Sequence, residues 1–267
     1  MKRTLFCLYL LTIIACSPAR EAIVSSKNVQ VKVMSYNIHI GIPPTKPGTT
    51  DIDAIVSAIK GQDPDIVALQ EVDVNTARTG KINEAAVIAE KLKMNFFFAK
   101  AIDHDGGDYG VAILSKFPLS ETKIHRLTTI EGTKGEPRVM ATAKITLKNG
   151  QAIRFASTHL DAQRPATNRE KQISEINSIS ASETLPLIIA GDFNAEPQST
   201  VIGKLDEMFT RTCTECAPTF PVVNPRTTID FIAYKKTSKI KTLSHSVVPE
   251  HYASDHLPVV ALLQLDF

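Results

Sequence analysis

Tryptophan is absent from this chain of 267 residues, aromatic residues make up only 6%, and there are four cysteines. The sequence also has no low-complexity tract, no repeat at the period of a solenoid and no obvious long insertion rich in aromatic residues. These absences argue against a repeat architecture and against a hairpin that enters a membrane through exposed aromatic side chains. Because 43% of the residues are hydrophobic, the chain can bury a substantial core as one large domain.

A hydrophobic run long enough to cross a bilayer is also lacking at the N-terminus. Residues 5–15 are mostly apolar and follow the basic pair Lys2 and Arg3, a pattern that suits a signal peptide better than a permanent membrane helix. The tetrapeptide that ends at Cys16, IIAC, resembles a bacterial lipobox, in which the cysteine is acylated. We therefore expect residues 1–16 to be a signal peptide and Cys16 to be the lipid anchor of an exported lipoprotein in the periplasm or at the cell surface. The alternative is an ordinary secretory signal in which Cys16 is incidental.

The mature chain has no surplus of charge of either sign. The whole sequence contains 30 Lys and Arg against 28 Asp and Glu, and removal of Lys2 and Arg3 leaves 28 against 28. A protein that binds nucleic acid without sequence preference usually carries a basic surplus, because its affinity comes from neutralised phosphates. Neutrality lowers the expectation of a nuclease without excluding one, since a local basic patch could suffice.

Only two cysteines, Cys213 and Cys216, remain in the body of the chain. No second ligand pair accompanies them at the spacing of a zinc site. In an exported protein their C-T-E-C spacing favours a local loop disulfide. Two unpaired structural thiols are the alternative, and neither cysteine is given a catalytic role.

The pattern of apolar residues predicts many strands with a few helices between them. Residues 17–28 are small and polar and are expected to be a tether, so that the catalytic domain covers residues 29–267. Helices are predicted after Asp51, from Asn83 to Leu92 and from Asn168 to Ala181. Strands are predicted near 29–33, 66–69, 96–99, 110–115, 139–147, 152–158, 185–190, 228–234, 240–248 and 258–265. We expect an α/β fold, a four-layer αββα sandwich of two mostly antiparallel sheets with helices outside.

Polar residues gather where these strands end or begin. Asn37, Glu71 and His159 each follow a strand, and a second group of such residues comprises Asp192, Asn194, Asp230, Asp255 and His256. Carboxylate and amide oxygens are the ligands that Mg²⁺ or Mn²⁺ prefers. Taken singly, each residue could be a turn former, a solvated acid or a satisfied histidine. Because all of them are expected at strand ends along one rim of a sheet, their common position favours a preorganised site.

The order of these motifs carries a family resemblance. The series SYNIH (35–39), LQEVD (69–73), YGVAILSKFPL (109–119), STHLD (157–161), GDFNAEP (191–197), IDF (229–231) and SDHLPV (254–259) resembles the endonuclease/exonuclease/phosphatase superfamily. That superfamily includes pancreatic-type deoxyribonucleases, abasic-site endonucleases and sphingomyelinases. The resemblance covers about residues 29–267. The length and the EPR segment (136–138) are similar to the small bacterial metal-dependent hydrolases.

The resemblance implies a role for each matched position. It makes Glu71 the principal Mg²⁺ ligand, with Asn37 and Asp255 close to the metal. Asp192 would orient or deprotonate the attacking water, and Asn194 would hold a phosphate oxygen. His256 would contact the scissile phosphate, and Asp230 would fix its tautomer. The remaining matched residues are His159 as a second catalytic histidine, Arg138 as a phosphate contact, and Tyr109, which lies near the site without an assigned role.

These observations predict an exported, membrane-anchored phosphoesterase that uses Mg²⁺, with Mn²⁺ as the alternative ion. Its expected substrate is a lipid head group or a small phosphoester, because neutrality and membrane attachment favour these over a polymer. The alternative is an extracellular or periplasmic nuclease that acts on DNA or RNA. A non-enzymatic binding protein on the same scaffold is the third reading. We expect the protein to be a monomer.

Overall fold

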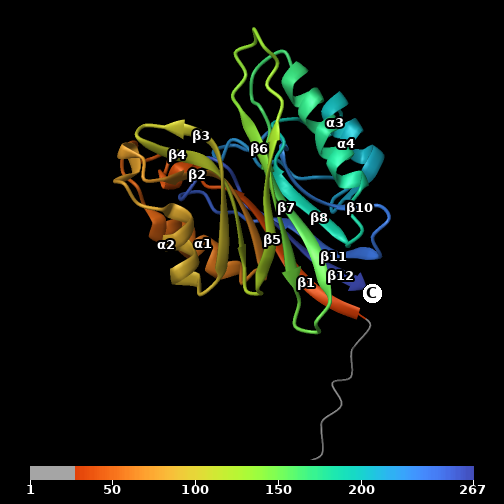
Figure 1. The fold of residues 1–267 in the computed structure, drawn as a ribbon. Helices are drawn as coiled ribbons and strands as arrows, with labels where there is room; N and C mark the ends of the chain where they lie inside the picture. Colours follow the sequence, from red (N-terminus) through yellow and green to blue (C-terminus); the bar gives the residue numbers. More distant parts are fainter. Residues whose placement is uncertain (1–27) are drawn as a thin grey trace, which may run out of the picture.

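The computed structural model describes residues 28–267 and places their strands in two six-stranded sheets. The first sheet has the order β11-β12-β1-β2-β4-β3, and the second has the order β5-β6-β7-β8-β10-β9 (Figure 1). The strands of the first sheet are β1 (Asn28–Asn37), β2 (Ile66–Val74), β3 (Asn95–His104), β4 (Gly107–Ser115), β11 (Ile240–Val247) and β12 (Val259–Asp266). Those of the second are β5 (Leu119–Leu127), β6 (Arg138–Thr146), β7 (Ala152–His159), β8 (Leu187–Asp192), β9 (Phe209–Arg211) and β10 (Asp230–Lys235).

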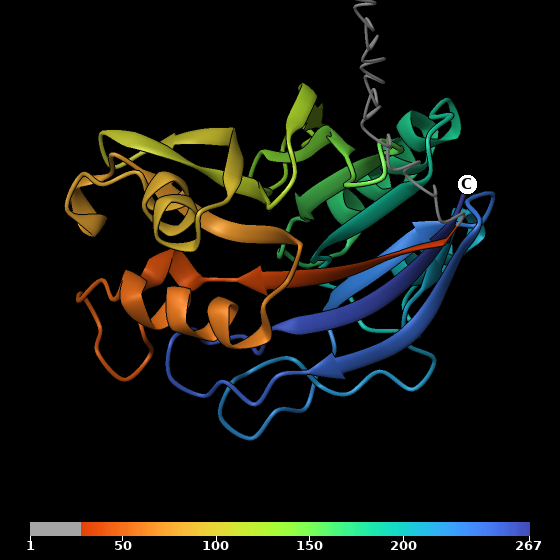
Figure 2. The same ribbon diagram turned by 90° about the horizontal axis from the view of Figure 1, so that it is seen from below.

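Four helices cover the outer faces of the sheets, which gives the predicted four layers. The helices are α1 (Ile52–Gln62), α2 (Glu84–Leu92), α3 (Thr167–Ala181) and α4 (Thr200–Met208). Figures 1 and 2 show α1 and α2 on one side of the paired sheets and α3 and α4 on the other. Two short 3₁₀ turns, η1 (His39–Gly41) and η2 (Ala77–Thr79), follow β1 and β2. The predicted sandwich is therefore confirmed.

The two sheets repeat one connection pattern. In the first sheet β1 leads through α1 to a parallel β2, which pairs with β4, which pairs with β3. In the second sheet β7 leads through α3 to a parallel β8, which pairs with β10, which pairs with β9. All other pairings are antiparallel. The last residues of β1 and β8, Asn37 and Asp192, are hydrogen-bonded to each other, so the ends of these corresponding strands lie at the same rim of the sandwich.

Local chemistry explains where the helices start and stop. The Asp51 side chain accepts a hydrogen bond from Ala54 N at 3.1 Å and begins α1. That helix ends at Asp63 in the left-handed conformation, immediately before Pro64, which cannot continue it. Asn83 caps α2 in the same way, through a bond from Ala86 N. Both starts agree with the predicted helices.

Apolar side chains fill the space between the layers. The alternation along β1 sends Val31 and Val33 into the core between the sheets, whereas Met34 and Tyr36 pack under α1 and α2. The core between the sheets includes the fully buried Phe155 of the second sheet. A third cluster lies between the second sheet and helices α3 and α4. The polar rim described below is therefore attached to a rigid double-sheet core.

The sequence patterns did not predict three of the elements, namely β5, β9 and α4. Five successive residues of β5, from Ser120 to Ile124, are exposed, so this edge strand has no apolar alternation to read. The α4 helix is only nine residues long and contains Gly203. Strand β1 already begins at Asn28, which was expected to be the last residue of the tether.

The predicted signal peptide, Cys16 and the rest of the tether lie outside the described residues. Within residues 28–267, no helix is long and apolar enough to span a membrane.

Candidate active site

The candidate site forms where parallel strands of both sheets end at one rim. In the first sheet Asn37, the last residue of β1, lies beside Gln70 of β2. In the second sheet His159 at the end of β7 lies beside Asp192 at the end of β8, and Asp230 at the start of β10 lies on the other side of Asp192. Within each sheet, strand pairing therefore fixes the positions of these residues relative to one another.

Glu71 occupies an irregular position in β2. The pairing of β2 with β4 shifts register between Leu69 and Val72, so that Glu71 lies in a bulge. Its φ angle is 55°, a left-handed value that is uncommon for a residue other than glycine and is often stored at functional sites. The bulge turns the half-buried Glu71 side chain toward the end of β1.

A single amide connects the two sheets at the rim. Asn37 Nδ2 donates to Glu71 Oε1 at 3.0 Å and to Asp192 Oδ2 at 3.1 Å. Its Oδ1 accepts a bond from the backbone N–H of His39. Ser254 Oγ donates to the backbone carbonyl of Asn37 at 2.7 Å and thereby holds the segment that carries Asp255 next to the end of β1.

His256 lies between two buried carboxylates. Its Nδ1 is 2.9 Å from Asp230 Oδ2, and its Nε2 is 3.8 Å from Asp192 Oδ2. Burial by itself lowers the pKa of His256, but the carboxylates of Asp230, Asp192 and Asp255 outweigh burial and raise that pKa to about 10. His256 is therefore protonated at neutral pH and can donate through Nε2 to an anionic oxygen.

His159 has the opposite electrostatic setting. Arg138 Nη1 lies 3.2 Å from its Nδ1, and a guanidinium can only donate, so the proton of the neutral ring belongs on Nε2. Burial, and then the positive charge of Arg138, holds the pKa of His159 well below its usual value. The His159 Nε2 lies 3.5 Å from Asp192 Oδ2 and 3.0 Å from Asn194 Nδ2. Arg138 thus reaches the site by way of His159, and it also pairs with Glu136 at 2.7 Å.

Asp192 is the common neighbour of these groups. Burial, and then the adjacent charge of Asp230, raises the pKa of Asp192 above its usual range. The backbone N–H of Asn194 donates to its Oδ1 at 2.8 Å, which together with the Asn37 bond fixes the orientation of the carboxylate. A carboxylate of raised pKa, held in one orientation, is suited to accept a proton from water.

Aromatic packing adds a residue that the motifs did not single out. The Phe220 ring lies 4.7 Å from the His256 ring, centroid to centroid. Thr219 Oγ1 accepts bonds from the backbone N–H groups of Ile229 and Asp230, and the Thr219 carbonyl accepts from Leu257 N. The segment PTF (218–220) ends ten residues before Asp230 in the sequence, and the contact of Phe220 with His256 depends on tertiary folding.

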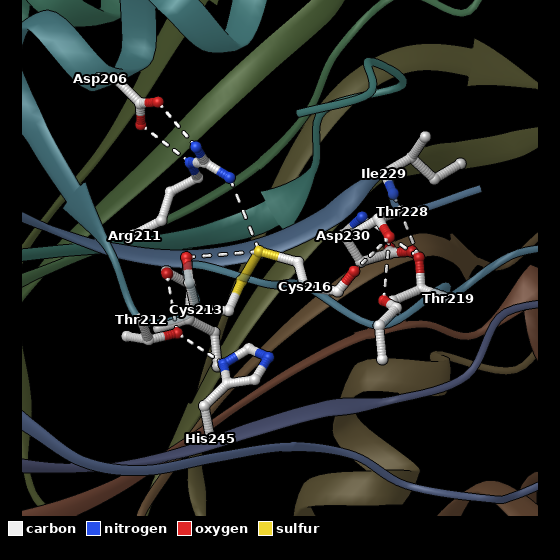
Figure 3. The surroundings of a disulfide bond; sticks show 12 residues. Asp206, Arg211, Thr212, Cys213, Cys216, Thr219, Thr228, Ile229, Asp230 and His245 are labelled. Atoms are coloured by element: carbon white, nitrogen blue, oxygen red, sulfur yellow. Dashed lines mark hydrogen bonds and ion pairs between the residues drawn. A yellow bond between two sulfur atoms is a disulfide. The ribbon is translucent and has the colours of Figure 1, made fainter. Parts of the chain in front are cut away.

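A disulfide closes the start of the loop that carries Phe220. Cys213 and Cys216 are bonded, with Cα atoms 5.1 Å apart, which confirms the expected local disulfide. Thr228, two residues before Asp230, donates from Oγ1 to the carbonyls of Cys216 and Ala217 (Figure 3). These two hydrogen bonds tie the turn closed by the disulfide to the segment that leads into β10, the strand that supplies the partner of His256.

The donor set fits a divalent cation that prefers oxygen. Glu71 and Asp255 are half-buried carboxylates at the rim, and Asn37 lies between Glu71 and Asp192. In this arrangement the amide nitrogen of Asn37 faces the carboxylates, and its Oδ1 accepts the backbone N–H of His39. Within residues 28–267, the carboxylate and histidine atoms that converge most closely are those of Asp192, Asp230 and His256, which lie within 4.8 Å of one another. One buried oxygen of this group, Asp230 Oδ1, has no hydrogen-bond partner.

Taken together, the rim unites the predicted residues of the body of the chain. Hydrogen bonds or close ion contacts join Asn37, Glu71, Arg138, His159, Asp192, Asn194, Asp230 and His256, while Asp255 adjoins them through Ser254. Tyr109 lines the same hollow as Glu71, and burial and then the charge of Glu71 raise the pKa of its phenol. Cys16 lies outside the described residues.

Comparisons with known proteins agree with this geometry. The Escherichia coli (strain K12) uncharacterized protein YbhP is 26% identical over 250 residues, which cover 88% of this chain and 96% of YbhP. An endonuclease/exonuclease/phosphatase structure from Beutenbergia cavernae has a TM-score of 0.74 at 21% identity and covers 88% of this chain and 72% of its own. A mannosyl-6-phosphatase from Bacteroides thetaiotaomicron has a TM-score of 0.70 at 18% identity, with coverage of 87% and 99%. These two structures are similar in fold. Residues 34–256 match the Endonuclease/Exonuclease/phosphatase family, and the chain belongs to that family.

Proposed function

We propose that the protein is an exported, Mg²⁺-dependent hydrolase of small phosphoesters. The observation that carries the proposal is the convergence on Asp192 of a protonated histidine, His256, and an amide, Asn37, that also binds Glu71. Family membership makes phosphoester hydrolysis the expected chemistry. The ion, the export and the substrate class are our inferences from the donor set and from the N-terminal sequence.

The chain's own residues can divide the work of hydrolysis. Asp192 would accept a proton from the attacking water, because burial beside Asp230 raises its pKa. His256, held through Nδ1 by Asp230, would donate to a phosphate oxygen as negative charge develops there. Asn194 and His159 would supply further donors on the second-sheet side. Mg²⁺ held by Glu71, with Asp255 and Asn37 close by, would neutralise charge on the phosphate.

Two hollows flank this group and suggest a substrate with substituents on both sides of the phosphorus atom. One has a volume of about 640 Å³ and is lined by Asn194 and Phe220 together with Arg164. The other has a volume of about 200 Å³ and is lined by Glu71 and Tyr109. Hollows of these sizes suit a small molecule better than a long polymer. The phosphatase activity in the name of the Bacteroides thetaiotaomicron relative supports the same choice.

A panel of substrates tests the proposal directly. The purified protein is assayed with bis-p-nitrophenyl phosphate, inositol phosphates, sphingomyelin and plasmid DNA, with Mg²⁺, with Mn²⁺ and after chelation. We expect Mg²⁺-dependent turnover of a small ester, and we expect His256→Ala and Asp192→Ala to abolish it while the fold is kept. Near-normal activity in either variant would refute the assignment. Cleavage of DNA alone would favour the nuclease, and no turnover with either ion would favour a binding protein.

A further inference from the structure

The larger hollow beside the catalytic group lies at the beginnings of two helices. Its volume is about 640 Å³, and its lining includes Ala166 and Ser199, the N-cap residues of α3 and α4. Figure 1 shows these helices next to each other on the outer face of the second sheet. Ser199 Oγ accepts the backbone N–H of Ile202, whereas Ala166 has no side-chain oxygen to cap α3. The hollow is therefore faced by helix ends that present backbone N–H groups.

Arg169, in the first turn of α3, has an edge of its guanidinium without a partner. The residue lines the hollow and is only 8% exposed. Its Nη1 donates to the carbonyls of Asp161 and Gln163 at 2.7 and 2.8 Å. Its Nε is buried without a hydrogen bond, and its Nη2 donates to no residue of the described range 28–267. Because unpaired buried donors cost free energy, an acceptor at the Nε–Nη2 edge would stabilise the site.

Two other arginines of the protein show what this edge binds. Arg78 donates from Nε and Nη2 to the two carboxylate oxygens of Asp73 at 2.7 and 2.8 Å. Arg211 binds Asp206 through the same two nitrogens at 2.9 and 2.8 Å. The spacing of these donors matches two oxygens of a carboxylate or of a phosphate group. The corresponding edge of Arg169 is therefore suited to an oxyanion.

The charges around the hollow nearly balance. Its charged lining residues are Arg164, Arg169 and Glu196, and none of them forms an ion pair with a residue of the part of the chain that the structure describes. Burial lowers the pKa of Arg169, the carboxylate of Asp161 opposes this effect, Arg164 adds to it, and Asp192 opposes it least. The oxygens of Asp161 already accept three hydrogen bonds from other donors. An anion in the hollow would therefore be recognised by directed donors more than by a surplus of charge.

The hollow shares residues with the catalytic rim. Asn194 lines it and donates from its backbone N–H to Asp192 Oδ1 at 2.8 Å. Phe220 also lines it, and its ring lies 4.7 Å from the ring of His256. Together with Ile229, Phe220 gives the hollow an apolar wall. A molecule whose phosphate lies at His256 can therefore extend past Phe220 into the hollow.

We propose that the hollow binds a second anionic group of the substrate, a carboxylate or a further phosphate. The Nε–Nη2 edge of Arg169 holds this group, and the exposed Arg164 pairs with it from the solvent side. The carbon skeleton that joins it to the scissile phosphate packs on Phe220. The substrate class is then a small phosphoester with two anionic groups. The inference rests on the proposed function, because it names the substrate of the same site.

A matched series of esters tests for the second group. Phosphate release is measured with phenyl phosphate, 4-carboxyphenyl phosphate and hydroquinone bisphosphate in the presence of Mg²⁺. We expect kcat/KM to be about tenfold higher or more for an ester with a second anionic group, because a charge-assisted bidentate hydrogen bond contributes on that scale. A preference for only one of the two would identify the oxyanion that the hollow takes. Equal kcat/KM for all three esters would overturn the inference.

Variants of the two arginines locate the effect. Arg169→Lys keeps the charge but loses the planar fork, and Arg164→Gln changes an exposed residue without a structural contact in the fold. Each should remove most of the preference and leave kcat/KM for phenyl phosphate unchanged. Arg126→Gln, at an exposed position of β5 outside the hollow, is the control and should keep the preference. Melting curves verify the fold, and a preference that persists in Arg164→Gln and in folded Arg169→Lys would contradict the assignment.

Binding measured without hydrolysis separates this inference from the proposed function. Benzylphosphonate and 4-carboxybenzylphosphonate have a P–C bond in place of the ester bond, and calorimetry gives their Kd values. We expect the carboxylated compound to bind the wild type about tenfold more tightly and Arg164→Gln to lose most of this difference. That result without hydrolysis of any ester would defeat the proposed function alone. Hydrolysis of all three esters at equal kcat/KM would defeat the second anionic group alone.

Discussion

Individual side chains at the rim depend on buried charges for their protonation. Asp230 is almost fully buried and pairs with His256 Nδ1 at 2.9 Å, while the opposite nitrogen of the ring faces Asp192. Without the negative charge of Asp230, burial would dominate and the pKa of His256 would fall. Asp230 is therefore a positioning residue that keeps a hydrogen-bond donor available in the site.

Replacement of Asp230 by asparagine tests this dependence. We expect Asp230→Asn to lower kcat by roughly 10²–10³ and to move the alkaline limb of the pH–rate profile to lower pH, because His256 then loses its proton sooner. The measurement is the hydrolysis of bis-p-nitrophenyl phosphate from pH 5 to 10, with melting curves to verify the fold. Asp266→Asn, at the exposed end of β12, is the control and should behave as the wild type. An unshifted alkaline limb would contradict the role.

Glu84 is a buried acid outside the catalytic group. Its Oε2 accepts the backbone N–H of Asp73 at 2.7 Å, whereas Oε1 is buried without a partner. Burial raises the pKa of Glu84 to about 8. Since the folded protein then binds a proton that the unfolded chain has already lost, the contribution of Glu84 to stability is fully present below about pH 4.5 and is lost as the pH rises through about 8.

Removal of this charge should therefore remove a pH dependence. We expect Glu84→Gln to match the wild type at pH 4.5 and to exceed its free energy of unfolding by about 3–5 kcal/mol at pH 8.5. Urea denaturation at a series of pH values measures the difference. Glu90→Gln, an exposed position on the same helix, should leave the pH dependence as it is. Parallel curves for wild type and Glu84→Gln would show that Glu84 ionises normally.

At the scale of elements, the loop before β10 controls the surroundings of His256. It places Phe220 against the histidine ring, and the Cys213–Cys216 disulfide closes its first turn. A cross-link that closes a loop this short lowers the conformational entropy of the unfolded chain and thereby raises the free energy of unfolding by roughly 2 kcal/mol. The cross-link adds to the hydrogen bonds by which Thr219 and Thr228 hold the loop to the start of β10.

Loss of the disulfide should weaken both the fold and the loop. We expect Cys213→Ser/Cys216→Ser to lower the free energy of unfolding by roughly 2 kcal/mol and to raise KM more than it lowers kcat, because Phe220 lines the larger hollow. Denaturation and steady-state kinetics measure the two effects. Reduced wild-type protein should reproduce them, and the double variant itself should not respond to the reductant. Identical stability of oxidised and reduced wild type would contradict this expectation.

The helices and strands that bury one face could be predicted from the sequence. Elements without a buried face could not be predicted. Asp51 and Asp63-Pro64 marked both ends of α1, because capping and proline act locally. The exposed edge strand β5 left no periodic pattern. The motifs located the residues of the rim, but the left-handed bulge at Glu71 depends on pairing with β4, and the contact of Phe220 with His256 depends on the closed loop. Such features follow from tertiary contacts that no local pattern contains.

At the scale of the whole molecule, a bound cation should stabilise the fold. A ligand that binds only the folded state raises the free energy of unfolding by about 2.7 kcal/mol at 100 times its Kd. We therefore expect Mg²⁺ to raise the melting temperature of the wild type, and Glu71→Gln to abolish most of the increase. Scanning calorimetry with and without Mg²⁺ measures it, and Asp266→Asn should respond as the wild type. If Mg²⁺ raised the melting temperature of Glu71→Gln as much as that of the wild type, Glu71 would not be a ligand of the bound ion.

The Asn37 amide bonds to Glu71 in one sheet and to Asp192 in the other, at the margin of the core that includes Phe155. The distance between the catalytic carboxylates is therefore set by the thickness of that core. Displacements of about 1 Å in a reacting geometry can cost roughly a hundredfold in rate. The rate of turnover therefore depends on the spacing of the two sheets. A folded core variant such as Phe155→Leu would alter the rate although it replaces no catalytic residue.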